Sequence, residues 1–110
     1  FTPHLMPMFR GILSTIYVET KKNISAKNVY NFLKKYHKKN VFVKFKKFNS
    51  NLGTEDVMNT NNCEISICTD RSKNKIIILS AIDNLIKGGS GQAVQNMNVA
   101  FNLKENFGLK

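Results

Sequence analysis

The stretch CEISICTDRSKNKIIILSAI, residues 63–82, contains the clearest structural pattern in the chain. Apolar and polar residues alternate from 63 to 69, a polar cluster follows from 70 to 74, and a second β-prone run extends from 75 to 82. This pattern predicts a β-hairpin, because a period of two places alternate side chains on one face and the polar cluster marks the turn. The second run is apolar without interruption from Ile76 to Leu79, so we expect both of its faces to be covered.

Upstream of the hairpin, the sequence predicts two more strands with a helix between them. Alternation over residues 12–19 and again over residues 41–46 is typical of strands. Ser25 is a suitable helix cap, and the i, i+3, i+4, i+7 spacing after it predicts a helix. The apolar face of that helix would consist of Val29, Phe32, Leu33 and Tyr36.

Two further segments complete the expected fold. Residues 49–62 are polar, contain Gly53 and predict a long loop. After the glycine-rich run at 88–91, a last helix is expected, with an apolar face formed by Ala93, Val94, Met97, Ala100 and Phe101. The order strand, helix, strand, strand, strand, helix predicts an α+β fold in one domain, residues 1–110.

The positive charge of the chain is concentrated in one region. The formal net charge is +10, and residues 21–47 contain ten lysines and no acidic residue. These lysines are Lys21, Lys22, Lys27, Lys34, Lys35, Lys38, Lys39, Lys44, Lys46 and Lys47. The cluster is compatible with RNA binding, but it contains no arginine, the residue that binds phosphate and guanine through a bidentate fork. We therefore favour a solvated surface, and nucleic acid is not an expected partner.

The cysteines, the apolar runs and the first residue narrow the classes of protein that remain possible. Cys63 and Cys68 are five residues apart, which on a strand directs them to opposite faces, so no disulfide is expected. Neither belongs to a metal-ligand or redox motif, and free thiols suit a reducing cytoplasm. No apolar run approaches the roughly 20 residues that span a bilayer. The chain begins with Phe1 rather than Met, from which we expect a piece of a longer protein.

Two segments are candidates for binding. The first is FTPHLMPMFRG, residues 1–11, in which two prolines favour an edge or a cleft and His4 and Arg10 are the residues able to hold a carboxylate or phosphate. The second is DNLIKGGSGQAVQN, residues 83–96, where a glycine-rich turn leads into a helix amino-terminus. Free N–H groups there favour an anion or cofactor, although the pattern matches no standard nucleotide loop and no Rossmann half is present. No nucleophile with a positioned base is visible, and no catalytic residue or metal site is expected.

Together these segments show a resemblance to a known family. FTPHLMPMFRGILSTIYV at one end and SAIDNLIKGGSGQAVQNMNVAFNL at the other resemble the carboxyl-terminal domain of N-acetyl-gamma-glutamyl-phosphate reductases. The resemblance spans nearly the whole chain and implies a glyceraldehyde-3-phosphate-dehydrogenase-like domain, a mixed sheet with helices on one face. It further implies a cytoplasmic homo-oligomer that uses NADPH to reduce N-acetyl-glutamyl phosphate to N-acetyl-glutamate semialdehyde, in arginine biosynthesis.

The resemblance also implies residue roles. The family's catalytic cysteine and histidine lie upstream of the first segment, so this chain alone would be inactive. His4 and Arg10 would bind substrate. The cofactor would contact Lys87, Gly88, Gly89, Gly91, Gln92 and Asn96. Two rival interpretations stay open, a basic RNA-binding module and a free-standing dimerisation or regulatory domain.

Overall fold

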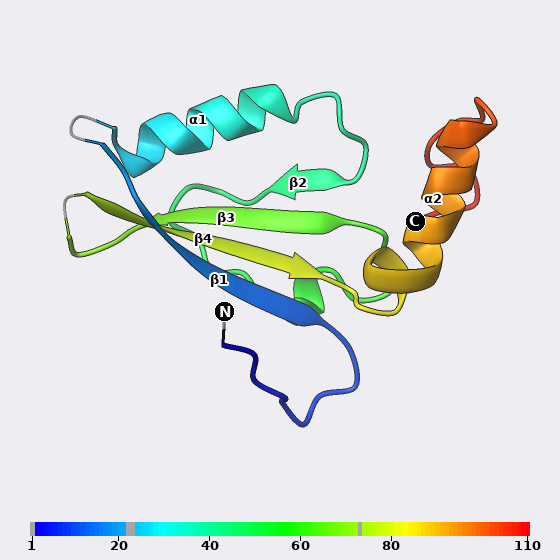
Figure 1. Ribbon diagram of the computed structural model, residues 1–110, viewed down its shortest axis with the longest axis horizontal. Coiled ribbons are helices and arrows are strands. Elements are labelled where there is room, and N and C mark those ends of the chain that lie inside the picture. Colours follow the sequence, from blue (N-terminus) through cyan, green and yellow to red (C-terminus); the bar gives the residue numbers. More distant parts are fainter. Residues whose placement is uncertain (1, 22–23, 73) are drawn as a thin grey trace.

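The computed structural model describes residues 2–21, 24–72 and 74–110 and has an α+β architecture. Its elements are β1 (Ile12–Glu19), α1 (Ala26–Tyr36), β2 (Val43–Phe45), the 3₁₀ turn η1 (Thr54–Asp56), β3 (Cys63–Thr69), β4 (Lys75–Ile82), the π-helical turn η2 (Ile86–Ser90) and α2 (Gly91–Ala100). The four strands form one sheet in the order β1-β4-β3-β2 (Figure 1). β4 is antiparallel to both β1 and β3, whereas β2 is parallel to β3, so the sheet is mixed as expected.

The hairpin prediction is confirmed with its boundaries, since β3 ends at Thr69 and β4 begins at Lys75. Both faces of β4 are covered. Ile76 packs under α1 in one hydrophobic cluster, and Ala81, on the other face, packs against Leu52 and Val57. Leu52 and Val57 belong to the predicted loop at 49–62, which therefore forms part of the core on the face opposite α1.

Helix α1 begins where Ser25 predicts. The Ser25 Oγ accepts the Asn28 backbone N–H, and the Asn28 side chain accepts the Ser25 N–H, so two groups at the helix start are satisfied. The predicted apolar face, however, is wrong in part. The residues that meet the sheet are Ala26, Val29, Tyr30 and Leu33, which have the expected spacing but begin three residues earlier.

Phe32 and Tyr36 lie on the flank of α1 instead of beneath it. Their side chains are 67% and 71% exposed and stack on each other with ring centroids 6.3 Å apart. Spacing alone could not choose between the two overlapping apolar stripes, because both have the same helical period. The choice follows from Phe45 and Phe48, which contact the ring of Tyr30.

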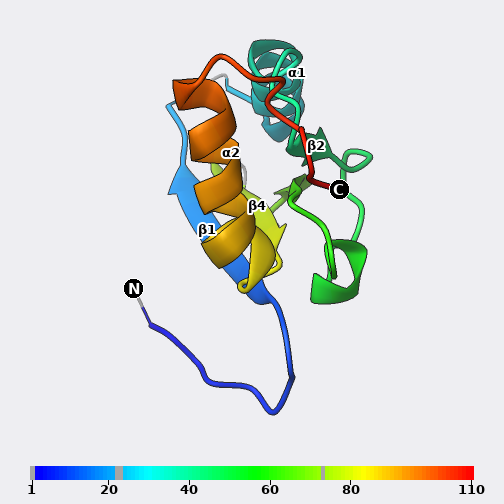
Figure 2. The ribbon, with the colours of Figure 1, turned by 90° about the vertical axis from the view of Figure 1, so that its right-hand side faces the viewer.

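Of the helices, α1 covers a face of the sheet, while α2 stands beyond its end (Figures 1 and 2). The expected last helix is confirmed, but its apolar side chains are largely exposed, including Met97 and Phe101. Strand β2 is shorter than predicted because Val41 and Phe42 lie in the turn after α1. In the described ranges, no helix has the length and apolar character needed to cross a membrane.

Candidate functional site

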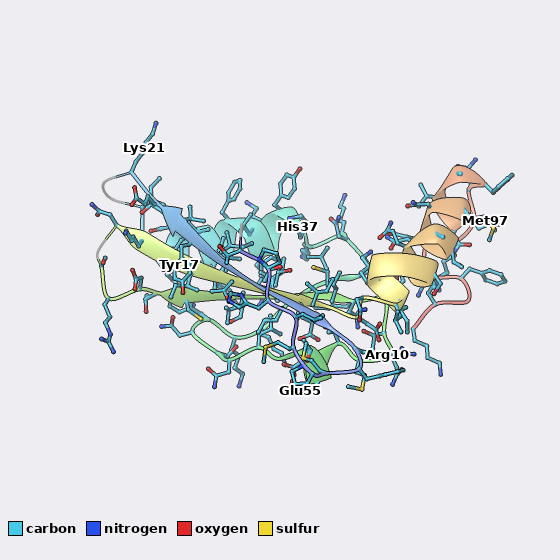
Figure 3. All side chains as sticks on the ribbon, turned by 60° about the horizontal axis from the view of Figure 1, so that its bottom comes forward. Arg10, Tyr17, Lys21, His37, Glu55 and Met97 are labelled. Carbon is cyan, nitrogen blue, oxygen red and sulfur yellow. The ribbon has the colours of Figure 1, made fainter. Side chains whose placement is uncertain are left out.

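The two candidate segments meet at the end of the sheet from which α2 rises. Arg10 and Gly11 directly precede β1, and Asp83 and Asn84 directly follow β4. Because β1 and β4 are antiparallel with Ile12 opposite Ile82, the start of one strand adjoins the end of the other. Figure 3 shows Arg10 at this end, near α2 and far from His37.

Arg10 is held by two side chains through a single nitrogen. Its Nη1 donates to Asp83 Oδ2 and to Asn59 Oδ1, each at 3.1 Å. The guanidinium also lies over the ring of Phe9, 5.6 Å from its centroid. Across the ranges that the structure covers, no hydrogen bond involves Nε or Nη2, so this edge of the guanidinium is free to bind an oxyanion.

We call the region where Arg10 and Gly11 meet Asn59, Asp83 and Asn84 the corner. Asp83 makes most of its hydrogen bonds. Its side chain is fully buried and accepts four hydrogen bonds, from Arg10 and Asn59 on Oδ2 and from the N–H groups of Leu85 and Ile86 on Oδ1. Burial opposes ionisation, but these donors outweigh it and hold the pKa of Asp83 below its ordinary value. The carboxylate is therefore charged, and it neutralises part of Arg10.

The glycine-rich segment does not present the row of free N–H groups that its sequence predicts. The N–H groups of Gly88, Ser90 and Gly91 donate to the carbonyls of Asp83, Leu85 and Ile86 respectively. The π-helical turn η2 continues into α2 across a kink at Gly89, whose φ of −150° and ψ of −111° are not helical. These three N–H groups are therefore already paired and would not bind an anion in this conformation.

Two of the expected cofactor residues face inward. The Lys87 Nζ donates to Gln95 Oε1 at 2.6 Å and lies 5.4 Å from the centroid of the Phe42 ring. Burial lowers the pKa of Lys87, and the nearby Cys63 and Glu105 offset this only in part. At Gly91, any side chain would collide with Asn61 Oδ1 and Ile86, so this glycine is required by packing.

The other expected cofactor residues lie at the surface. Gly88 and Gly89 are exposed, and a side chain at Gly89 would meet only ordinary contacts. On α2, Gln92 Nε2 donates to Asn96 Oδ1 at 2.8 Å, and within the described part of the chain the Asn96 NH₂ group and the Gln92 Oε1 have no hydrogen-bond partner. These four residues can still meet a ligand.

His4 is not brought to this corner by any contact. It lies in an extended, exposed segment that runs outside the sheet (Figure 2), and within the described part of the chain its side chain makes no hydrogen bond. Beside the corner is a shallow groove of about 280 Å³. It is lined by Asn59, Ile86, Ser90, Gly91, Val94, Gly108, Leu109 and Lys110.

The two cysteines and part of the lysine cluster contact neighbouring residues of the fold. Cys63 and Cys68 are free thiols that contact Ser80 and Ser50. Lys46 pairs with Asp56 and Glu64, and Lys27 and Lys34 lie over the Tyr30 ring, while Lys22 falls outside the described residues. The other lysines of the cluster are exposed, in agreement with a solvated surface. Among the residues that are placed, no three His, Cys, Asp or Glu side chains gather as a metal site requires.

Comparison with known proteins gives the family. Residues 1–84 match the family described as "Semialdehyde dehydrogenase, dimerisation domain". The chain belongs to this family. The α+β fold with its mixed four-stranded sheet agrees with that assignment.

Proteins named N-acetyl-gamma-glutamyl-phosphate reductase are similar to this dimerisation domain over its whole length. One from Thermoanaerobacter pseudethanolicus is 49% identical over 109 residues, which cover 99% of the chain and 32% of that protein. Another from Halothermothrix orenii is 48% identical over 110 residues, covering 100% and 32%. A third, from Staphylococcus saprophyticus, is 43% identical over 109 residues, covering 99% and 32%. The chain spans about a third of the length of the curated relatives it matches.

Sequence reasoning missed three residues of this corner, Asp83, Asn59 and Asn84. Asn84 Oδ1 accepts the Gly11 N–H at 2.7 Å, and Asn59 adopts a positive φ of 62°. Asp83 had a signal, since it is an acid at the end of an apolar strand directly before a turn. Asn59 had none, because only the tertiary fold brings the loop at 49–62 to Arg10.

Proposed function

We propose that the complete protein containing this domain is an N-acetyl-gamma-glutamyl-phosphate reductase. In this reaction the acyl phosphate is reduced to N-acetyl-glutamate semialdehyde, and phosphate and NADP⁺ are released. The similarity to proteins of that name over the full length of the chain is the observation that carries the proposal. The proposal places the protein in arginine biosynthesis in the cytoplasm.

Arg10 is the residue we expect to bind the acyl phosphate. Its Nε and Nη2 form a planar pair of donors that suits two oxygens of a phosphate or carboxylate. Because Asp83 and Asn59 take only Nη1, binding substrate would not require either contact to break. His4 is a second proposed substrate residue, and it would have to approach from the exposed segment that carries it.

The cofactor side would be formed by Gly88, Gly89, Gln92 and Asn96. NADPH would supply the hydride. A carboxamide such as that of nicotinamide needs one donor and one acceptor, which the NH₂ group of Asn96 and the Oε1 of Gln92 can provide. Lys87 and Gly91 support this surface from within, through Gln95 and Asn61, instead of touching the cofactor.

The dimerisation role suggests a specific surface. Strand β1 is an edge of the sheet, and Ile12, Leu13, Ile16 and Tyr17 are 44–70% exposed on its two faces. A long edge strand with exposed apolar side chains is rarely left uncovered in a stable protein. We propose that β1 forms the contact with a second copy of the chain.

The test is an assay of the complete protein with NADPH and N-acetyl-glutamyl phosphate. We expect NADPH oxidation and phosphate release in equal amounts. Aspartyl phosphate serves as the control substrate, because it is an acyl phosphate of similar chemistry. Preference for aspartyl phosphate, or no NADPH consumption with either compound, would contradict the assignment.

An Arg10→Lys variant tests the substrate role. Lysine keeps the positive charge beside Asp83 but loses the paired donors, so KM for the acyl phosphate should rise roughly tenfold. KM for NADPH should stay within about twofold, since Arg10 does not contact the residues proposed to hold it. Steady-state kinetics of the complete protein measure both, and an unchanged acyl-phosphate KM would remove Arg10 from the site.

A further inference from the structure

The Asp83 carboxylate joins the two candidate binding segments through different oxygens. Oδ2 accepts Arg10 Nη1 at 3.1 Å and the Asn59 N–H at 2.9 Å. Oδ1 accepts the N–H groups of Leu85 at 2.9 Å and Ile86 at 3.1 Å, which start the turn that carries the glycines. One rigid, buried group therefore fixes a side chain of the first segment and the backbone of the second.

The contacts leave the Arg10 guanidinium little rotational freedom. Asp83 and Asn59 hold Nη1 from two directions, and the ring of Phe9 lies against the guanidinium. The free edge with Nε and Nη2 is thus aimed in a single direction, with the Arg10 side chain 24% exposed. A long side chain that is oriented before binding loses less conformational entropy when the ligand arrives.

The backbone next to Arg10 is anchored separately. Gly11 donates its N–H to Asn84 Oδ1, has a φ of 110°, and lies so close to Thr54 that any side chain there would collide with it. The position of the chain at residues 10–11 therefore does not depend on Asp83 alone. This separation allows the orientation of the guanidinium to be tested apart from the fold of the corner.

We propose that Asp83, assisted by Asn59, is a positioning residue that orients the Arg10 guanidinium toward the anionic group of the substrate. The proposal rests on the function proposed above. It assigns Asp83 no direct contact with substrate or cofactor. Its effect on substrate binding passes through Arg10, and its effect on the glycine-rich turn is structural.

Asp83→Asn in the complete protein is the main test. The amide keeps one acceptor oxygen for the Leu85 and Ile86 N–H groups but turns its NH₂ toward Arg10 Nη1 and the Asn59 N–H. We expect KM for the acyl phosphate to rise roughly tenfold and KM for NADPH to change less than about twofold. Combining Asp83→Asn with Arg10→Lys should add little to the Arg10→Lys effect, because both variants act on one interaction.

Asn84→Ala is the matched control. It removes the contact to the Gly11 N–H and leaves every Arg10 contact in place. We expect a lower Tm with KM for the acyl phosphate unchanged.

Should Asp83→Asn fail to fold, Asn59→Gly replaces it as the test of the positioning role. Glycine accepts the positive φ at this position, and the variant loses only the Oδ1 that accepts from Arg10. That variant should raise the same KM about two- to threefold.

Three outcomes would overturn the positioning role: equal rises of both KM values, a lower Tm with both KM values unchanged, or additive effects of the two substitutions. Each would make Asp83 a structural residue only. Failure of the unaltered protein to reduce the acyl phosphate is a different result, since it would contradict the proposed function itself.

Discussion

Asp83 illustrates how one residue determines the geometry of the site. It is fully buried, yet it stays ionised because four donors converge on it. The unfolded chain has no such donors, so folding lowers the pKa of this carboxyl from its ordinary value of 3.8. A lowered pKa means that Asp83 stabilises the folded state above pH 3.8, and that this contribution disappears as the pH falls through the folded-state pKa.

This linkage predicts a pH-dependent difference in stability. The free energy of unfolding of Asp83→Asn should be about 1–3 kcal/mol lower than that of the unaltered protein near neutral pH. Arg10 is the charged group that faces Asp83. Because this contribution depends on the ionised carboxylate, the difference should shrink as the pH falls below about 4. Urea unfolding of both proteins over a pH series measures it, and a constant difference would show that the charge of Asp83 is irrelevant.

At the scale of elements, α1 shows how a sheet selects one face of a helix. Two apolar stripes overlap on this helix, and the one containing Tyr30 is buried because the Phe45 and Phe48 rings lie opposite it. The stripe containing Phe32 stays on the flank. Burial of the large aromatic ring, rather than helix propensity, therefore decides the rotation of α1 about its axis.

The two aromatic residues should consequently differ in their contribution to stability. Tyr30→Ala should lower the free energy of unfolding by about 3–5 kcal/mol, the range for truncating a buried aromatic ring. Phe32→Ala, on the exposed flank, should change it by less than about 1 kcal/mol. Chemical denaturation compares them, and a larger loss for Phe32 would mean that the predicted face, not the observed one, meets the sheet.

At the scale of the whole molecule, much apolar surface is uncovered. Exposed apolar side chains lie on β1, on the segment before it (Leu5 and Phe9), and at α2, on the helix (Met97) and directly after it (Phe101). A dimerisation domain, as the family is described, is expected to expose apolar surface of this kind. The edge strand β1 is the part of this surface that we propose pairs with a second copy.

Replacing Ile16 by Asp tests this surface in the complete protein. A charge in the centre of an apolar interface is costly, so the dimer dissociation constant should rise at least ~100-fold. Asn40→Asp, which adds the same charge at an exposed position after α1, should leave association unchanged. Sedimentation velocity over a concentration series gives both values. Equal association of the two variants would exclude β1 as the interface.

The sequence by itself determined the elements and their class. The alternation of apolar and polar residues predicted the hairpin from Cys63 to Ile82, the Ser25 cap predicted the start of α1, and the glycine run predicted the helix after it. Each of these signals is local in the sequence. The sequence also singled out the two segments that meet at the site.

Only the tertiary structure decided which residues of those segments touch, because contacts between distant parts of the chain depend on strand register and side-chain packing. The antiparallel pairing of β1 and β4 brought Arg10 to Asp83, and the loop at 49–62 added Asn59. The same packing turned Lys87 inward and left His4 outside. The N–H groups of Gly88, Ser90 and Gly91, which the glycine pattern had predicted to be free, donate to nearby carbonyls instead. A backbone N–H in a folded protein binds an acceptor that the fold supplies.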